Sequence, residues 1–140
     1  MGLTGHFELD KEKYYLGEPL WVTLVIQNEG DQAIFLFVPR GRDHGLQITV
    51  KQGHGAHLKD FSREPEVGLV SEQRLSPNET FRQRYQLSQW LCITEPGDYT
   101  VECAIEIEGY NTGLHQNNVD RVSTKAMIST ELRFTILRNP

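Results

Sequence analysis

The sequence lacks the features that mark membrane, secreted and nucleic-acid-binding proteins. No stretch approaches the roughly 18 to 20 apolar residues that cross a bilayer, so we expect no membrane span. Residues 1–6 lack the basic and apolar regions of a signal peptide, which slightly favours a cytoplasmic location. The 19 acidic residues outnumber the 14 basic ones, and a net charge of -5 argues against nucleic acid as a partner.

Cysteine is also scarce. Cys92 and Cys103 are the two cysteines of the chain, too few for the disulfide framework of a small secreted domain. Cys103 lies on the apolar face of an expected strand, where a free thiol packs as a small hydrophobic group. We therefore expect both thiols to be unpaired.

Signatures of catalysis and nucleotide binding are missing. The chain has no Gly-x-Ser-x-Gly, no Gly-x-x-x-x-Gly-Lys-Ser/Thr and no Gly-x-Gly-x-x-Gly, the patterns that position a nucleophile or a phosphate. Cys92 could take His115 as a base only if a long loop folds back. The sequence therefore predicts a protein that is not an enzyme and that uses no cofactor.

One group of residues resembles a metal site. His54 and His57 lie in a glycine-rich turn, with His44 upstream and Asp60 downstream. Zinc requires three or four converging donors, and a pair of turn histidines supplies part of that set. We interpret them as exposed turn residues and predict no metal, which leaves a metal-dependent enzyme as the least favoured alternative.

The chain contains many short segments in which apolar and polar residues alternate. Odd positions from Tyr99 to Ile107 are apolar and most even positions are polar, and the even positions from Leu20 to Ile26 are all aliphatic, as in half-buried strands. Gly, Pro and Asn separate such segments. The pattern predicts one all-β domain over residues 1–140, an immunoglobulin-like antiparallel β-sandwich of seven to eight strands with Greek-key connections. The expected core is Val22, Leu24, Ile26, Tyr99, Val101, Cys103, Ile105, Leu132, Phe134 and Ile136.

Two further details bear on the sandwich. Tyr99 follows Pro96 and Gly97, where immunoglobulin-like sandwiches carry a corner tyrosine that bonds back to the backbone. Glu102, Glu106 and Glu108 alternate with apolar residues, so we expect an acidic row on the solvent face.

Two surfaces are candidates for binding a protein. Residues 33–38 are apolar throughout, so the face turned from the core consists of either Phe35 and Phe37 or three aliphatic residues. We expect the long segment 53–77 to fold over it; an exposed aromatic pair there would instead mark a partner contact. The connection 109–125 is rich in Tyr, Asn and Gly, an adaptable contact composition. The candidate contact residues are Phe35, Phe37, Tyr110, Asn111, Leu114, His115, Asn117 and Arg121.

Several motifs resemble the immunoglobulin-like modules of bacterial proteins. They are Gly17-Glu18-Pro19 before a strand, Asn28 at its end, Leu75-x-Pro77-x-Glu79, and Pro96-Gly97-x-Tyr99-x-Val101. The layout is most similar to the intracellular proteinase inhibitor family of Bacillus, although Asn78 stands where a glycine is common. No inhibitory residue can be matched. The expected function is a non-catalytic module that binds a protein or another macromolecule through loops or a sheet edge, with a protease inhibitor presenting a rigid loop as the alternative.

Overall fold

The computed structural model describes residues 2–39, 46–58, 70–111 and 123–139, and these form β-strands joined by turns, with one short 3-10 helix, η2 (Leu87–Gln89). The strands are β1 (Leu3–Leu9), β2 (Lys13–Tyr15), β3 (Trp21–Asn28), β4 (Ile34–Pro39), β5 (Gln47–Gln52), β6 (Ala56–Leu58), β7 (Val70–Leu75), β8 (Thr80–Gln86), β9 (Leu91–Ile93), β10 (Gly97–Tyr110) and β11 (Ser123–Leu137). β2, β6 and β9 have three residues each. The other eight strands correspond to the seven to eight that the sequence predicts.

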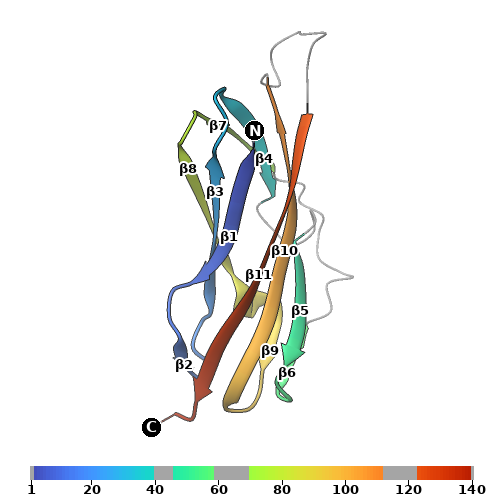
Figure 1. The fold of residues 1–140 in the computed structure, drawn as a ribbon. Helices are drawn as coiled ribbons and strands as arrows, with labels where there is room; N and C mark the ends of the chain where they lie inside the picture. The colour runs from blue at the N-terminus through green and yellow to red at the C-terminus, as the bar shows by residue number, and fades with distance from the viewer. Residues whose placement is uncertain (1, 40–45, 59–69, 112–122, 140) are drawn as a thin grey trace.

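Two sheets face each other as a sandwich (Figure 1). The three-stranded sheet has the order β1-β3-β8, and the six-stranded sheet has the order β2-β11-β10-β4-β7, with β5 also paired to β10. β6 and β9 form a separate pair. Every pairing is antiparallel except the one between β2 and β11. The predicted all-β sandwich is confirmed.

The core lies between the two sheets and follows the alternation of the sequence. In β10 every odd position from Tyr99 to Gly109 is buried, because successive side chains of a strand point to opposite faces. All ten residues of the expected core are buried, each at most 6% exposed. β10 and β11 pair without a register shift from Gly97 opposite Ile136 to Tyr110 opposite Ser123, so the alternation persists along both strands.

Tyr99 is the corner tyrosine that the sequence predicts. Its hydroxyl donates to the carbonyl of Glu95 at 2.5 Å, and its ring stacks on Phe134 with centroids 5.8 Å apart. A Cβ at Gly53, whose φ is +124°, would lie 2.1 Å from the Tyr99 ring, and one at Gly55 would lie 2.6 Å from the hydroxyl. The glycines of this turn are therefore required by the packing of Tyr99.

Asn28 joins the two sheets at the opposite end. Its side chain is fully buried, and its amide donates to the carbonyls of Gln32 at 2.8 Å and Leu75 at 3.0 Å. The Asn28 carbonyl accepts the N–H of Asn78 at 2.7 Å. Asn78 has φ 65°, which asparagine tolerates better than most residues. That conformation explains why this position commonly carries glycine in the modules that the chain resembles.

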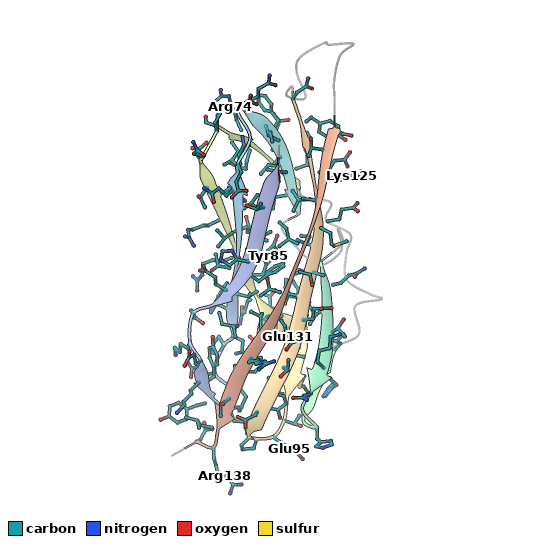
Figure 2. The ribbon with its side chains drawn as sticks, in the orientation of Figure 1. Arg74, Tyr85, Glu95, Lys125, Glu131 and Arg138 are labelled. Atoms are coloured by element: carbon teal, nitrogen blue, oxygen red, sulfur yellow. The ribbon has the colours of Figure 1, made fainter. Side chains whose placement is uncertain are left out.

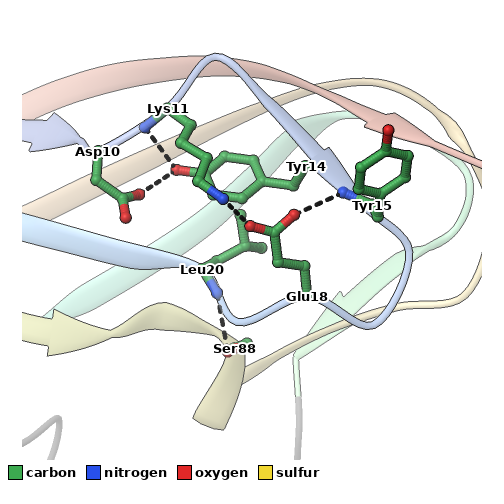
Figure 3. Close-up of polar contacts among 7 residues, drawn as sticks. All are labelled: Asp10, Lys11, Tyr14, Tyr15, Glu18, Leu20 and Ser88. Carbon is green, nitrogen blue, oxygen red and sulfur yellow. Dashed lines mark hydrogen bonds and ion pairs between the residues drawn. The ribbon is translucent and has the colours of Figure 1, made fainter.

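The N-terminal segment ties one edge of the sandwich together. The N–H of Phe7 donates to the Thr130 hydroxyl across the sheets at 2.9 Å. Tyr14, buried against Phe134, donates its hydroxyl to Asp10 at 2.6 Å (Figure 3). Burial raises the pKa of Tyr14, with its bond to Asp10 as the next cause. Glu18 closes the same turn by pairing with Lys11.

Candidate functional site

Three aromatic side chains gather on the outer face of the six-stranded sheet. The even positions of β4 are buried, so Phe35 and Phe37 point to the outer face, where both are partly exposed. Phe35 lies opposite Tyr110 of β10, and Phe37 lies opposite Glu108. The rings of Phe37 and Tyr110 meet edge to face, with centroids 5.3 Å apart and planes at 74°, a favourable geometry for aromatic pairs. Phe35, Phe37 and Tyr110 form the outer aromatic cluster.

Charged side chains border the outer aromatic cluster. β7 places Arg74 opposite Phe35. On the other side, Glu108 accepts a hydrogen bond from the Tyr110 hydroxyl and lies opposite Lys125 of β11. An apolar centre with a polar rim is the arrangement found in protein–protein interfaces.

The described part of the segment 53–77 does not fold over this face, contrary to the expectation from the sequence. Its last part forms β7, which pairs with the edge of β4 in the same sheet, and Phe35 and Phe37 stay partly exposed. Residues 59–69 lie outside the described ranges. Over the described part of the chain, the segment extends the sheet beside the cluster.

The predicted contact residues of the 109–125 connection divide into two groups. Tyr110 is the last residue of β10, and the exposed Asn111 follows it. The other four lie outside the described residues, and they are Leu114, His115, Asn117 and Arg121. Their contact role stays a prediction, although Tyr110 connects this segment directly to the outer aromatic cluster.

The histidine-rich turn has a structural explanation. His54 and His57 are exposed, and the flanking Gly53 and Gly55 are the glycines that Tyr99 requires. Among the described residues, no three His, Cys, Asp or Glu side chains come together in a way that could hold a metal ion. His44 and Asp60 lie outside the described ranges.

Both cysteines are free, as predicted. Burial raises the pKa of the Cys103 thiol to about 12, with Glu102 as a smaller cause. The thiol is therefore protonated at neutral pH, and the thiolate is the form that acts as a nucleophile. Cys92 is partly exposed, but His115, the base considered for it, is not among the described residues.

The acidic row lies on the outer face, as predicted. Glu106 is exposed, and Glu102 and Glu108 are partly exposed. Lys51 approaches Glu102 to 4.0 Å, a distance at which a surface ion pair contributes little. The row therefore solvates the sheet.

A shallow depression of about 640 Å³ occupies the far end of the same face. Its charged lining residues are Glu12, Lys13, Asp98 and Arg133. Asp98 already accepts a hydrogen bond from the Thr135 hydroxyl at 2.7 Å. The depression thus carries charges of both signs and selects no class of ligand.

One exposed apolar side chain was not predicted from the sequence. Met127 is 65% exposed, the largest exposure among the large hydrophobic residues of the described chain. The signal was present, because Ile128 and Leu132 share the core face of their strand and an odd-numbered neighbour must then face outward. Met127 lies opposite Glu106 on the outer face.

Over the described residues, the structure contains no helix with the length and apolar character that a membrane crossing requires. The cytoplasmic location stays a prediction.

No curated protein matches the sequence. The sequence model of one bacterial family, described as the N-terminal domain of flagellar collar protein C, matches residues 7–137. The matched range begins in β1 and ends with β11, so it takes in both sheets and the outer aromatic cluster. The chain belongs to the family of flagellar collar protein C N-terminal domains.

Proposed function

We propose that this chain is a non-catalytic structural module of the flagellar collar that binds another protein of that assembly. The family match over residues 7–137 carries the proposal, because the family is named for that structure. The match gives no support to the protease-inhibitor alternative.

The contact surface in this proposal is the outer aromatic cluster. Aromatic residues are enriched at protein interfaces because they bury a large area with few rotatable bonds. The partly exposed rings of Phe35, Phe37 and Tyr110 are flanked by Arg74 and Lys125. The neighbouring candidates Asn111, Leu114, His115, Asn117 and Arg121 would extend the contact along the connection after β10.

The test is made in the bacterium that encodes the chain. Its gene is replaced by the Phe35→Ser/Phe37→Ser variant, and the collar is imaged in flagellar motors by cryo-electron tomography. We expect collar density to be lost or reduced, as in a strain that lacks the gene. Circular dichroism of the purified variant checks that the sandwich is retained.

Trp21→Ser is the matched control. Trp21 is a partly exposed aromatic residue on the outer face of the other sheet, with the Arg84 guanidinium 4.4 Å from its ring centroid. This variant should leave the collar intact. A complete collar in the strain without the gene would refute the flagellar role, and equal collar loss in both variants would refute the outer aromatic cluster as the contact surface.

A further inference from the structure

One edge of β11 pairs with no strand of the described residues along most of its length. β10 covers the opposite edge from Ser123 to Ile136, and β2 pairs with the free side at 135–137 alone. Among the described residues, no strand pairs with this side of 123–134. An open edge of this kind can accept a further strand through its backbone groups.

The direction of the backbone groups follows from the contact with β2. The N–H of Thr135 donates to the Glu12 carbonyl, and the Leu137 carbonyl accepts the N–H of Leu16. In an antiparallel strand, alternate residues direct both backbone groups to the same side. Because the register with β10 is unbroken, the N–H and C=O of odd-numbered residues from Ser123 to Arg133 point to the open edge.

The core side of this strand is already occupied by the other sheet. The N–H of Phe7 in β1 donates to the Thr130 hydroxyl, and a Cβ at Gly5 would lie 2.6 Å from Cδ1 of Ile128. β1 belongs to the three-stranded sheet, and it therefore packs against the core face of β11. Among the described residues, no strand pairs with the edge itself in the plane of the six-stranded sheet, and residues 7–12 lie beside 130–133 across a depression of about 360 Å³.

Side chains along the open edge have complementary charges. Lys125 and Glu131 both lie on the outer face and both are exposed (Figure 2). Glu131 lies opposite Glu102 of β10, and like charges in such a position destabilise a sheet. Glu131 pairs with Arg133 at 3.0 Å, but the Arg133 side chain is 80% exposed to water. A second cation beside the Glu131 carboxylate would therefore be favourable. Between the two charges lies Met127, which is 65% exposed.

We propose that two copies of this chain associate edge to edge through β11. The two strands run antiparallel about a two-fold axis at Ile128, so that the six-stranded sheets of both copies become continuous. Lys125 and Glu131 are each three residues from Ile128, and Lys125 of each copy therefore lies opposite Glu131 of the other. Because a two-fold contact uses the same patch twice, the dimer contains two such ion pairs.

The charges select this register. An axis at Lys125 would place the two Lys125 side chains opposite each other, which is repulsive. With the axis at Ile128, Met127 of one copy lies opposite Ser129 of the second copy. The Met127 residues of the two copies are then diagonal neighbours. The apolar contact is then central and the ion pairs flank it. This dimer goes beyond the collar role proposed above, because it depends on the β11 edge and requires no other protein.

The test uses the purified chain in sedimentation velocity over a range of concentrations. We expect a monomer–dimer equilibrium for the unchanged chain. Lys125→Glu and Glu131→Lys each turn both ion pairs into repulsions, so each variant alone should raise the dimer Kd by about tenfold or more. An equimolar mixture of the two variants should associate again, because both pairs of the mixed dimer are once more of opposite charge.

Proline substitutions test the backbone contact. Met127→Pro removes an N–H that points to the open edge, and proline is tolerated in edge strands, so this variant should fold and be monomeric. Met127→Thr keeps the N–H and separates the loss of the side chain from the loss of the hydrogen bond. Ala126→Pro is the control for strand direction, since it removes an N–H directed at β10 and should lower the unfolding temperature.

Three results would overturn the proposal. The first is a chain that stays monomeric at its highest soluble concentration. The second is a dimer that persists unchanged in Met127→Pro. The third is a mixture of Lys125→Glu and Glu131→Lys that associates no better than either variant alone. Failure of the collar experiment leaves all three measurements unaffected, so the two proposals can be refuted separately.

Discussion

Two tyrosines of β10 show how one residue type serves two different purposes. Tyr99 near the start of the strand is 2% exposed, stacks on Phe134 and donates to a backbone carbonyl. Tyr110 at the end is partly exposed, meets Phe37 edge to face and donates to the Glu108 carboxylate. Their residue numbers differ by an odd number, so they point to opposite faces of the sheet.

The surroundings of the two rings differ as much as their directions. Gly53 and Gly55 lie so close to Tyr99 that neither position could carry a Cβ without a shift. Tyr110 instead has Phe35 opposite it and charged side chains nearby. We infer that Tyr99 stabilises the fold and that Tyr110 belongs to the outer contact surface.

The largest effect is expected when the two rings are removed in turn. Tyr99→Ala should lower the free energy of unfolding by about 3 to 5 kcal/mol, since a large buried ring leaves a cavity. Tyr110→Ala should cost about 1 kcal/mol or less, because its ring is partly exposed. Urea denaturation followed by circular dichroism measures both. Equal losses would contradict the division between a structural and a contact tyrosine.

The glycine turn offers a second test of the structural end. Gly53→Ala should cost about 3 kcal/mol, because the new Cβ meets the Tyr99 ring and the positive φ is strained. Gly17→Ala is the control, since Gly17 also has a positive φ, +89°, but nothing within 4 Å of an added Cβ. It should cost about 1 kcal/mol. If thermal unfolding shifts equally in the two variants, crowding by Tyr99 is not the cause.

Removing the hydroxyl groups separates the two tyrosines more finely. Tyr99→Phe leaves the Glu95 carbonyl without its donor and should cost about 1 to 1.5 kcal/mol. Tyr110→Phe breaks a bond to the side chain of Glu108, which water can replace, and should cost less than about 0.5 kcal/mol. Chemical denaturation of both variants at one temperature measures the difference. A larger loss in Tyr110→Phe would reverse the assignment.

The core face of β10 can also be probed by pH. Burial raises the pKa of Cys103 to about 12 from its ordinary value of 9.0, so the unfolded chain loses this proton first as the pH rises. Stability is retained below pH 9 and falls above it. From pH 9 to 10 we expect the unchanged chain to lose about 1 kcal/mol more than Cys103→Ala, measured by urea denaturation with reductant present.

Cys92→Ala is the control for that measurement. Cys92 is partly exposed on β9, so its removal should leave the alkaline loss of stability unchanged. The buried Tyr14 and Tyr85, whose pKa values are also raised by burial, remain in every variant. Parallel curves for the unchanged chain and Cys103→Ala would show that the thiol does not carry the effect.

Alternation along single strands made much of this fold predictable from the sequence. Val22 and Val101 are buried because their neighbours in sequence already specify which face meets the core. The bond from Tyr99 to Glu95 followed from a local motif that is common in sandwiches. Both depend on residues within one strand and the turn beside it.

Structural features that depend on contacts between residues far apart in the sequence were not predictable. The sequence shows Asn28 only as the polar end of a strand, yet it is fully buried because it reaches the Leu75 carbonyl, 47 positions away. His54 and His57 resembled part of a metal site, whereas the glycines of the same turn, Gly53 and Gly55, are explained by the ring of Tyr99 on another strand. The outer aromatic cluster likewise needed the register of β4 on β10, which no local pattern specifies.

The parallel pairing of β2 with β11 has a mechanical consequence. The start of β1 and the end of β11 lie at opposite ends of the sandwich (Figure 1). A force that draws Leu3 and Leu137 apart therefore slides β2 lengthwise along β11 and stretches the bonds from Thr135 to Glu12 and from Leu16 to Leu137 together rather than in succession. Loads along this axis are shared between hydrogen bonds, and such a geometry suits a component that transmits tension.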